Sequence, residues 1–219
     1  MPRLLFEKTG NAVWMSHLDL MRVFQRSFKR AGLPLTHTQG FNPRPSVSIA
    51  LPLSVGVESV CELLDFDLDG EMVTNEEICR RLNSVLVTGV RVLDVYDGGR
   101  KLKELAYLHA SVTLEYDNNI PEKGVVALEQ LFSAKELIVE KKGKNGVQQQ
   151  DIIPMLQSLA VNANGEKQLL LDCVVCCQNP SLNPAQLVAA IARYLPELAP
   201  DFARIKRLEI LDSGKNIFR

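Results

Sequence analysis

Between residues 16 and 31 the apolar positions recur at the spacing of an amphipathic helix. Ser16 followed three residues later by Asp19 resembles a capping box, which predicts the start of this helix. Gly32 and Pro34 predict its end, because glycine tolerates the conformation that closes a helix and proline cannot continue one. The buried side is expected to hold Leu18, Leu20, Met21, Phe24, Phe28 and Ala31.

Shorter apolar runs predict strands over residues 4–8, 35–37, 46–51, 60–68 and 90–96. Thr74 predicts the start of a second helix, which ends near Leu86. We interpret this order as β-α-β-β-α-β, the ferredoxin-like or split βαβ arrangement.

The second half of the chain repeats that order less regularly. Helices are predicted from Pro121 to residue 132 and from Asn183 to residue 194, and hairpin turns at residues 143–146 and 164–165. The expected fold class is α+β, with two tandem ferredoxin-like units built on antiparallel sheets. The predicted domains are residues 1–98 and 107–219, and the predicted strands of the second are 108–116, 136–142, 158–162, 168–178 and 205–211.

Composition is that of a globular protein, with 46% apolar and 23% charged residues. No apolar run is long enough for a membrane span, and the first residues lack the apolar core of a signal peptide, so we expect a cytoplasmic protein. The net charge of −1 hides an asymmetry, because residues 3–50 hold seven basic residues and two acids, a net charge of +5. This excess predicts a local surface that binds anions.

Four of these cations, Arg22, Arg26, Lys29 and Arg30, are expected on the face of the first helix opposite its apolar side. No acid lies four residues before or after any of them, so a neutralised solvent face is the weaker interpretation.

Residues 36–45 have the least ordinary composition in the chain. Pro43 and Pro45 restrict the backbone, and Gly40 permits a turn, so the segment is expected to be a stiff loop between the second and third strands. The simple alternative is a proline-rich connection without function. As a binding loop, it would present His37, Gln39, Phe41, Asn42 and Arg44.

The cations of the first helix and the side chains of residues 36–45 together suit a nucleic acid as ligand. Lysine and arginine neutralise phosphates, Phe41 could stack on an unpaired base, and Asn42 could read a base edge. His17, at the start of the helix, is a possible secondary contact. If His17 and His37 meet near Arg44, acid–base cleavage of RNA becomes possible.

No catalytic residue and no metal site is predicted. Cys173, Cys176 and Cys177 lie in a strand-like apolar run and are expected to be small buried hydrophobic residues. The carboxylates of Glu62, Asp65 and the acids that follow are expected on a solvent-facing side. No nucleotide-binding glycine motif occurs.

Three stretches resemble a bacterial family of radical SAM-linked (radical SAM-associated) proteins, a domain of unknown function: residues 14–26, 38–45 and 50–59. The resemblance is strong over residues 3 to about 100. It implies a radical SAM enzyme encoded nearby, of a type with a predicted cobalamin-binding region. That enzyme would carry the iron–sulfur cluster, S-adenosylmethionine and any cobalamin. This chain would hold none of them. The Cys-x3-Cys-x2-Cys pattern that binds the iron–sulfur cluster of radical SAM enzymes is absent from its sequence.

Three hypotheses follow. The leading one is an accessory subunit, without catalysis of its own, that binds RNA or a ribonucleoprotein substrate and presents it for RNA modification. The second is a metal-independent endoribonuclease of the kind that tandem ferredoxin-like units form in RAMP-type CRISPR proteins, although the glycine-rich C-terminal loop of those enzymes is missing. The third is a module that only docks the radical SAM partner.

Overall fold

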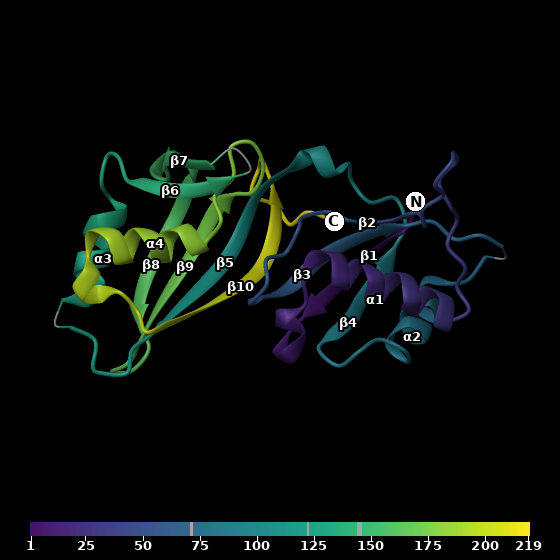
Figure 1. Cartoon of the computed structure of the whole chain (residues 1–219), viewed down its shortest axis with the longest axis horizontal. Helices are drawn as coiled ribbons and strands as arrows, with labels where there is room; N and C mark the ends of the chain where they lie inside the picture. The colour runs from purple at the N-terminus through teal and green to yellow at the C-terminus, as the bar shows by residue number, and fades with distance from the viewer. Residues whose placement is uncertain (71, 122, 144–145) are drawn as a thin grey trace. The chain divides into compact units, whose positions relative to one another are not determined.

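A computed structural model of the chain describes residues 1–70, 72–121, 123–143 and 146–219 (Figure 1). It consists of two compact units: unit 1 is Met1–Lys103 together with Arg219, and unit 2 is Glu104–Phe218. The division falls inside the segment 98–106 that separates the two predicted domains. Each unit combines antiparallel strands with helices, so the predicted α+β class is confirmed.

Unit 1 is a four-stranded antiparallel sheet with two α-helices. Its strands lie in the order β4-β1-β3-β2. Along the chain the elements are β1 (Arg3–Lys8), the short helix η1 (Gly10–Trp14), α1 (His17–Arg30), β2 (Val47–Ile49), β3 (Val57–Phe66), α2 (Asn75–Asn83) and β4 (Val90–Tyr96).

The second strand differs from the prediction. Residues 35–37 form no strand, and only isolated bridges join Leu35 to Leu68 and His37 to Pro45. The two prolines cannot donate backbone hydrogen bonds, so a continuous ladder cannot form there. The loop at residues 36–45 therefore lies between α1 and β2, and not between the second and third strands.

Helix α1 begins at the predicted cap, because the Ser16 hydroxyl accepts the Asp19 amide N–H at 3.2 Å. Phe24 packs edge-on against Phe6 of β1, with ring centroids 4.7 Å apart, and Phe28 lies 5.0 Å from Phe66 of β3. These contacts fix the rotation of the helix. The prediction for Leu18 was wrong: its side chain is 65% exposed, because it lies too far around the helix to reach the sheet.

The end of α1 also follows the sequence signal. Gly32 has φ +67°, and the Leu33 amide donates to the Phe28 carbonyl at 2.9 Å. This is the closing hydrogen bond of a Schellman motif.

Unit 2 is a second four-stranded antiparallel sheet, in the order β10-β5-β9-β8. The residues predicted as its second strand instead form β6, which pairs only with β7 in a separate hairpin. Residues 144 and 145 of the predicted turn lie outside the described residues. The elements are β5 (Leu105–Glu115), α3 (Gly124–Phe132), β6 (Ile138–Gly143), β7 (Gly146–Asp151), β8 (Leu156–Ala163), β9 (Gln168–Cys176), α4 (Ala185–Tyr194) and β10 (Phe202–Asp212).

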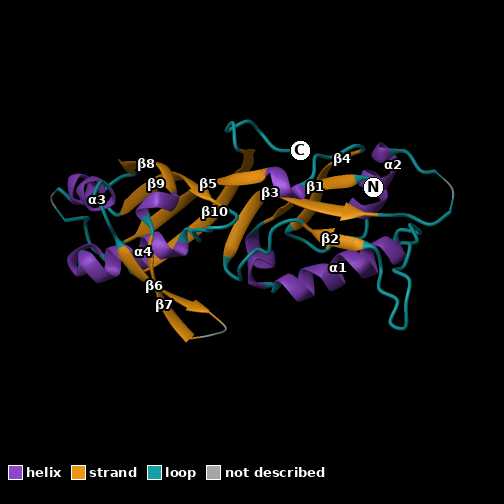
Figure 2. Ribbon diagram, turned by 90° about the horizontal axis from the view of Figure 1, so that it is seen from above, coloured by secondary structure: helices purple, strands orange, loops and turns teal. Residues whose placement is uncertain are grey.

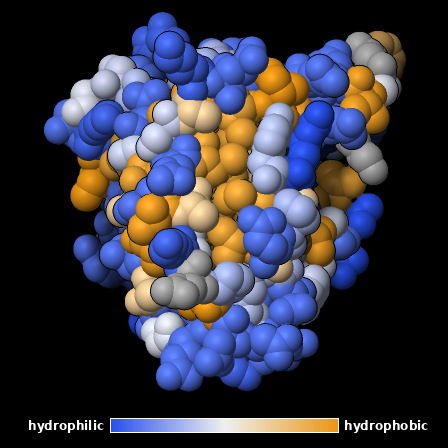
Figure 3. Space-filling model, turned by 90° about the vertical axis from the view of Figure 1, so that its left-hand side faces the viewer, coloured by the Kyte–Doolittle hydropathy of each residue, from blue (hydrophilic) through white to orange (hydrophobic). Residues whose placement is uncertain are grey.

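Apolar side chains gather in the middle of the face drawn in Figure 3, where hydrophilic side chains surround them. Val126 of α3 is 48% exposed and is one of the exposed apolar residues of unit 2. Within the described ranges, no helix has the length and apolar content needed to cross a membrane.

Candidate functional site

Residues 36–46 form a narrow projection, which we call the arm, near the C-terminal end of α1 (Figure 2). Its two ends are joined by a hydrogen bond from the Ser46 amide to the Thr36 carbonyl at 2.8 Å. Asp67, just after β3, holds both ends: its carbonyl accepts from the Thr36 amide at 3.0 Å, and its amide donates to the Ser46 carbonyl at 3.1 Å. The base of the arm is therefore anchored to the sheet.

The outer part of the arm is closed by Thr38 and Arg44. The Thr38 amide donates to the Arg44 carbonyl at 2.9 Å, and the Arg44 amide donates to the Thr38 hydroxyl at 3.0 Å. Beyond this closure the side chains have little cover, and Phe41 is 111% exposed relative to its reference state. A phenyl ring fully in water contributes no burial to folding, and it is accessible to a ligand. The predicted residues Gln39, Asn42 and Arg44 are exposed on the same arm.

All four predicted cations of α1 are exposed, but two are engaged. Arg22 forms an ion pair with Asp19 at 3.1 Å. Asp19 lies three residues earlier, whereas the prediction considered only acids four residues away. The Ser16 hydroxyl, assisted by Arg22, lowers the pKa of Asp19. Arg30 donates to the carbonyl of Val85.

The side chains of Arg26 and Lys29, the other two cations of this face, make no hydrogen bond or ion pair with any described residue. Elsewhere the charge excess of residues 3–50 overstates the cationic surface. Arg3 is 3% exposed and Lys8 is fully buried, where its ammonium donates to the Met15 carbonyl at 3.0 Å. These two cations belong to the interior of unit 1.

The arm and the cationic helix meet at a hollow of about 420 Å³, which we call the basic hollow. Lys29 enters it from α1 and His37 from the arm, and the Schellman turn supplies the wall between them. The residues that line it include Gln25, Lys29, Pro34, Leu35, His37 and Pro45. No acidic side chain is among its described lining residues, so the hollow is suited to an anion.

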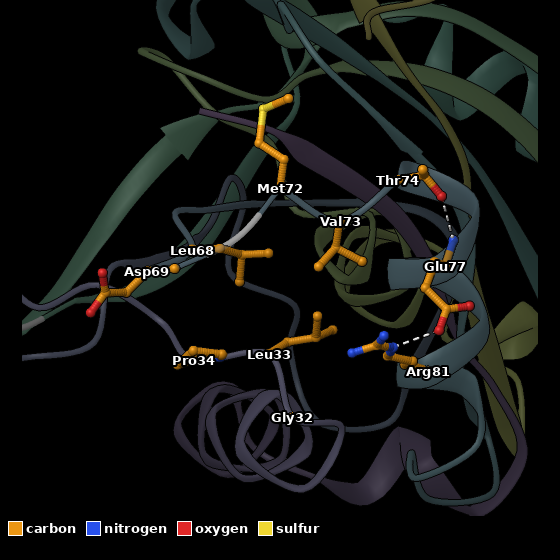
Figure 4. A pocket seen from close by; sticks show the side chains of 11 residues that line it. Gly32, Leu33, Pro34, Leu68, Asp69, Met72, Val73, Thr74, Glu77 and Arg81 are labelled. Carbon is orange, nitrogen blue, oxygen red and sulfur yellow. Dashed lines mark hydrogen bonds and ion pairs between the residues drawn. The ribbon is translucent and has the colours of Figure 1, made fainter.

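A neighbouring hollow of about 510 Å³ shares Gly32 and Pro34 with the basic hollow but differs in charge (Figure 4). Its cation, Arg81, is paired with Glu77 at 2.6 Å. Hydrogen bonds from Arg80 and then Arg81 lower the pKa of Glu77 to about 2. Leu33, Leu68 and Val73 supply apolar wall, so this second hollow offers no uncompensated positive charge.

The two histidines of the cleavage hypothesis lie apart. His17 is the first residue of α1, whereas His37 shares the basic hollow with Lys29, three turns further along the helix. At a rise of about 1.5 Å per residue, the twelve residues from His17 to Lys29 span roughly 18 Å. The condition of the cleavage hypothesis, that His17 and His37 meet near Arg44, is therefore not met.

Of the three cysteines predicted to be buried, only Cys173 is, because Cys176 and Cys177 are partly exposed. Cys173 is buried in β9, where burial, followed by the charge of Asp172, raises its pKa to about 12. Burial raises the pKa of Cys177 to about 11, although this thiol is only partly covered. Both stay protonated at neutral pH. Across the described part of the chain, no group of three or more His, Cys, Asp or Glu side chains is arranged to hold a metal ion.

An apolar surface lies at the opposite end of α1 from the basic hollow. Trp14 is 64% exposed, Leu18 65% and Val55 53%. They come from adjoining segments, because the Gly56 amide donates to the Val13 carbonyl at 2.8 Å. We call these three residues the Trp14 patch. Exposed tryptophan with apolar neighbours is typical of protein-docking surfaces.

Sequence reasoning missed Gln25, Pro34, Leu35 and Pro45 as lining residues of the basic hollow. For Gln25 a signal existed, since it stands four residues before Lys29 and therefore on the same helical face. Chemically, the site combines free cations, hydrogen-bonding side chains and an exposed aromatic ring. It is equipped to bind and orient an anionic, aromatic ligand.

The chain matches the model of a protein family. The matching family is described as "Uncharacterized protein conserved in bacteria (DUF2344)", and its model covers residues 2–184 of this chain. No curated protein matches the chain.

Among solved structures, the chain is similar to one from a crystal structure of a Cbf5-Nop10-Gar1 complex. The TM-score is 0.55 at 8% sequence identity, over 95% of this chain and 48% of the other. A chain from a structure of an H/ACA RNP bound to a substrate RNA containing 2'-deoxyuridine matches with a TM-score of 0.49 at 8% identity, over 94% and 46%. This chain spans about half the length of each solved chain, and such low identity concerns the fold alone.

Proposed function

The chain belongs to the DUF2344 family of uncharacterized bacterial proteins, and on that premise we propose that it is a non-catalytic binding subunit that presents RNA, or an RNA–protein substrate, to a radical SAM enzyme. The observation that carries the RNA part is the basic hollow, where Lys29 of the cationic helix and His37 of the arm come together. Phosphates attract the cations, and unpaired bases stack on exposed aromatic rings such as Phe41.

Single-stranded RNA is the form that this surface suits. The arm is one narrow projection with one aromatic ring at its tip, and Asn42 and Gln39 beside it offer donors and acceptors for base edges. Bases in a duplex are stacked on each other and unavailable to Phe41, whereas loops and single strands expose them.

The radical SAM partner rests on the resemblance of residues 14–26, 38–45 and 50–59 to radical SAM-linked proteins. The partner would supply the iron–sulfur cluster, S-adenosylmethionine and any cobalamin. The Trp14 patch supports a protein contact at the end of α1 away from the basic hollow. One helix would then join the enzyme at its start to the RNA near its end.

We also propose that both units are ferredoxin-like. In each, the first strand of the unit lies between its last strand and its penultimate strand, as β4-β1-β3-β2 and β10-β5-β9-β8. This order supports a split βαβ arrangement, with the β6–β7 hairpin as an insertion in unit 2.

RNA binding is tested by fluorescence anisotropy with a labelled single-stranded oligoribonucleotide at low and moderate salt. Replacing both Arg26 and Lys29 by glutamate should weaken binding, and loss of two phosphate contacts should lower the salt slope by about 1.4. Arg91→Glu reverses an exposed cation on β4 and serves as the matched control. Absence of binding at low salt, or an equal loss in the Arg91 variant, would contradict the proposal.

The partnership is tested by co-expressing the chain with the radical SAM enzyme encoded beside it and purifying through a tag on one of them. Leu18→Glu places a charge in the Trp14 patch and should abolish co-purification. Val87→Glu changes another apolar side chain of unit 1, 41% exposed, and should leave it intact. Separate elution of the two wild-type proteins would refute the partnership.

A further inference from the structure

The basic hollow has two kinds of wall. Gln25 and Lys29 stand one helical turn apart on α1 and, with His37, form its polar part. Pro34, Leu35 and Pro45 form an apolar part. At about 420 Å³ it falls within the range of roughly 300–1,000 Å³ that small-molecule sites occupy. A ligand that fills it must therefore be anionic at one end and flat or apolar at the other.

One feature of α1 opposes an anion here, because the C-terminal end of a helix carries partial negative charge. That charge resides on the last four carbonyl groups, from Phe28 to Ala31, and two of them are occupied. The carbonyls of Phe28 and Lys29 accept the amides of Leu33 and Gly32 at 2.9 and 3.2 Å. The ammonium of Lys29 has no described partner and supplies positive charge to the hollow.

The apolar part suits a nucleobase. The proline rings of Pro34 and Pro45 supply apolar surface to the hollow, and a base covers such a surface without losing its edge hydrogen bonds. The Gln25 amide offers both a donor and an acceptor, which is the pairing that a base edge needs. The neighbouring hollow has no such combination, since its arginine is already neutralised by Glu77.

We infer that the basic hollow is a binding site for one nucleotide, with its phosphate at Lys29 and His37 and its base against Pro34 and Pro45, within reach of Gln25. The inference rests on the proposed function and makes it specific. The RNA would be a single strand with one nucleotide turned out into the hollow, while a neighbouring base stacks on Phe41. Such splayed nucleotides are the usual object of sequence-specific RNA recognition.

The test is isothermal titration of the full chain with the four nucleoside 5′-monophosphates, the matching nucleosides and inorganic phosphate. We expect saturable binding of at least one monophosphate, and binding about tenfold weaker for its nucleoside, which lacks the charge-assisted contacts. Lys29→Ala should weaken binding of the monophosphate by a similar factor. Gln25→Trp should block the hollow. Arg91→Ala, which removes an exposed cation on β4 outside the hollow, should leave binding unchanged.

Three outcomes overturn the inference: no monophosphate binds saturably, inorganic phosphate binds as tightly as the monophosphates, or Arg91→Ala loses as much affinity as Lys29→Ala. Circular dichroism verifies that each variant folds, and Lys29→Ala alters only an exposed side chain. The oligoribonucleotide assay separates this inference from the proposed function. RNA binding without monophosphate binding overturns only the nucleotide site, and monophosphate binding without RNA binding overturns only the RNA-presenting role.

Discussion

Arg3 and Asp65 lie directly opposite each other on β1 and β3, and the Arg3 Nε donates to the Asp65 Oδ1 at 2.5 Å. Their side chains are 4% and 20% exposed. Burial disfavours the guanidinium charge, but the hydrogen bonds and charge of Asp65 outweigh it and raise the pKa of Arg3. The carboxylate that the sequence assigns to a solvent-facing side therefore joins two strands of unit 1.

Removing Asp65 should destabilise unit 1. Asp65→Ala leaves an almost buried guanidinium without this carboxylate, and loss of one partner of such a pair costs about 3 kcal/mol of unfolding free energy. Urea denaturation followed by circular dichroism measures the change. The double variant Arg3→Met with Asp65→Leu should be more stable than Asp65→Ala, because it removes both charges. Equal stability of Asp65→Ala and wild type would contradict the role of the pair.

Glu77 should titrate near pH 2. Arg80 and Arg81 lower its pKa to about 2 from an ordinary value of 4.5. A depressed carboxylate contributes stability that is fully present above its ordinary pKa and disappears as the pH falls through the lowered one. NMR titration of the Glu77 side chain measures the midpoint, which should rise in high salt because the group is partly exposed and salt screens its ion pairs. A midpoint near 4.5 at low salt would show that the two arginines do not lower the pKa of Glu77.

Gly89 should not tolerate a side chain. Its φ is +88°, and an added Cβ would lie 2.4 Å from the Thr9 carbonyl oxygen. Gly89→Ala is expected to lower the unfolding free energy by about 3 kcal/mol, from backbone strain and the clash. Gly40 also has a positive φ but no atom within 4 Å of the added Cβ, so Gly40→Ala should cost less. Similar losses in both variants, measured by thermal unfolding, would contradict the clash.

The elements that the sequence predicts well depend on local signals. The cap at Ser16, the stop at Gly32 and the cap at Thr74 each involve residues within a few positions, and all three are present. Strand β4 has the predicted ends, Val90 and Tyr96, because turn signals bound it on both sides. Local hydrogen bonds need no knowledge of the rest of the chain.

The features that escape sequence reasoning depend on distant residues. Asp67 anchors the arm through Thr36, 31 positions earlier, and no local pattern indicates that contact. The burial of Arg3 and Lys8 likewise depends on strand pairing, so counting charges overstated the basic surface. The exposed residues of the arm were predictable from composition, whereas the basic hollow required the direction in which Gly32 turns the chain.

The hydroxyl of Thr38 should keep the arm closed. Thr38→Val preserves the shape of the side chain but removes the acceptor of the Arg44 amide. Loss of one such hydrogen bond, worth about 1 kcal/mol, should speed hydrogen exchange of that amide about fivefold. Thr38→Ser retains the hydroxyl and is the control. Unchanged exchange in Thr38→Val would show that the backbone alone holds the arm.

Phe41 offers the cleanest separation of binding from folding. Its side chain is 111% exposed, so Phe41→Ala should change the unfolding free energy by less than about 0.5 kcal/mol. If a base stacks on the ring, the same change should weaken single-stranded RNA binding by about 1–3 kcal/mol, or roughly 5- to 150-fold. Phe41→Trp should retain the affinity, because stacking needs only an aromatic face. Anisotropy titrations measure the affinity and urea denaturation measures the unfolding free energy. Undiminished affinity in Phe41→Ala would show that the ring does not contact the RNA.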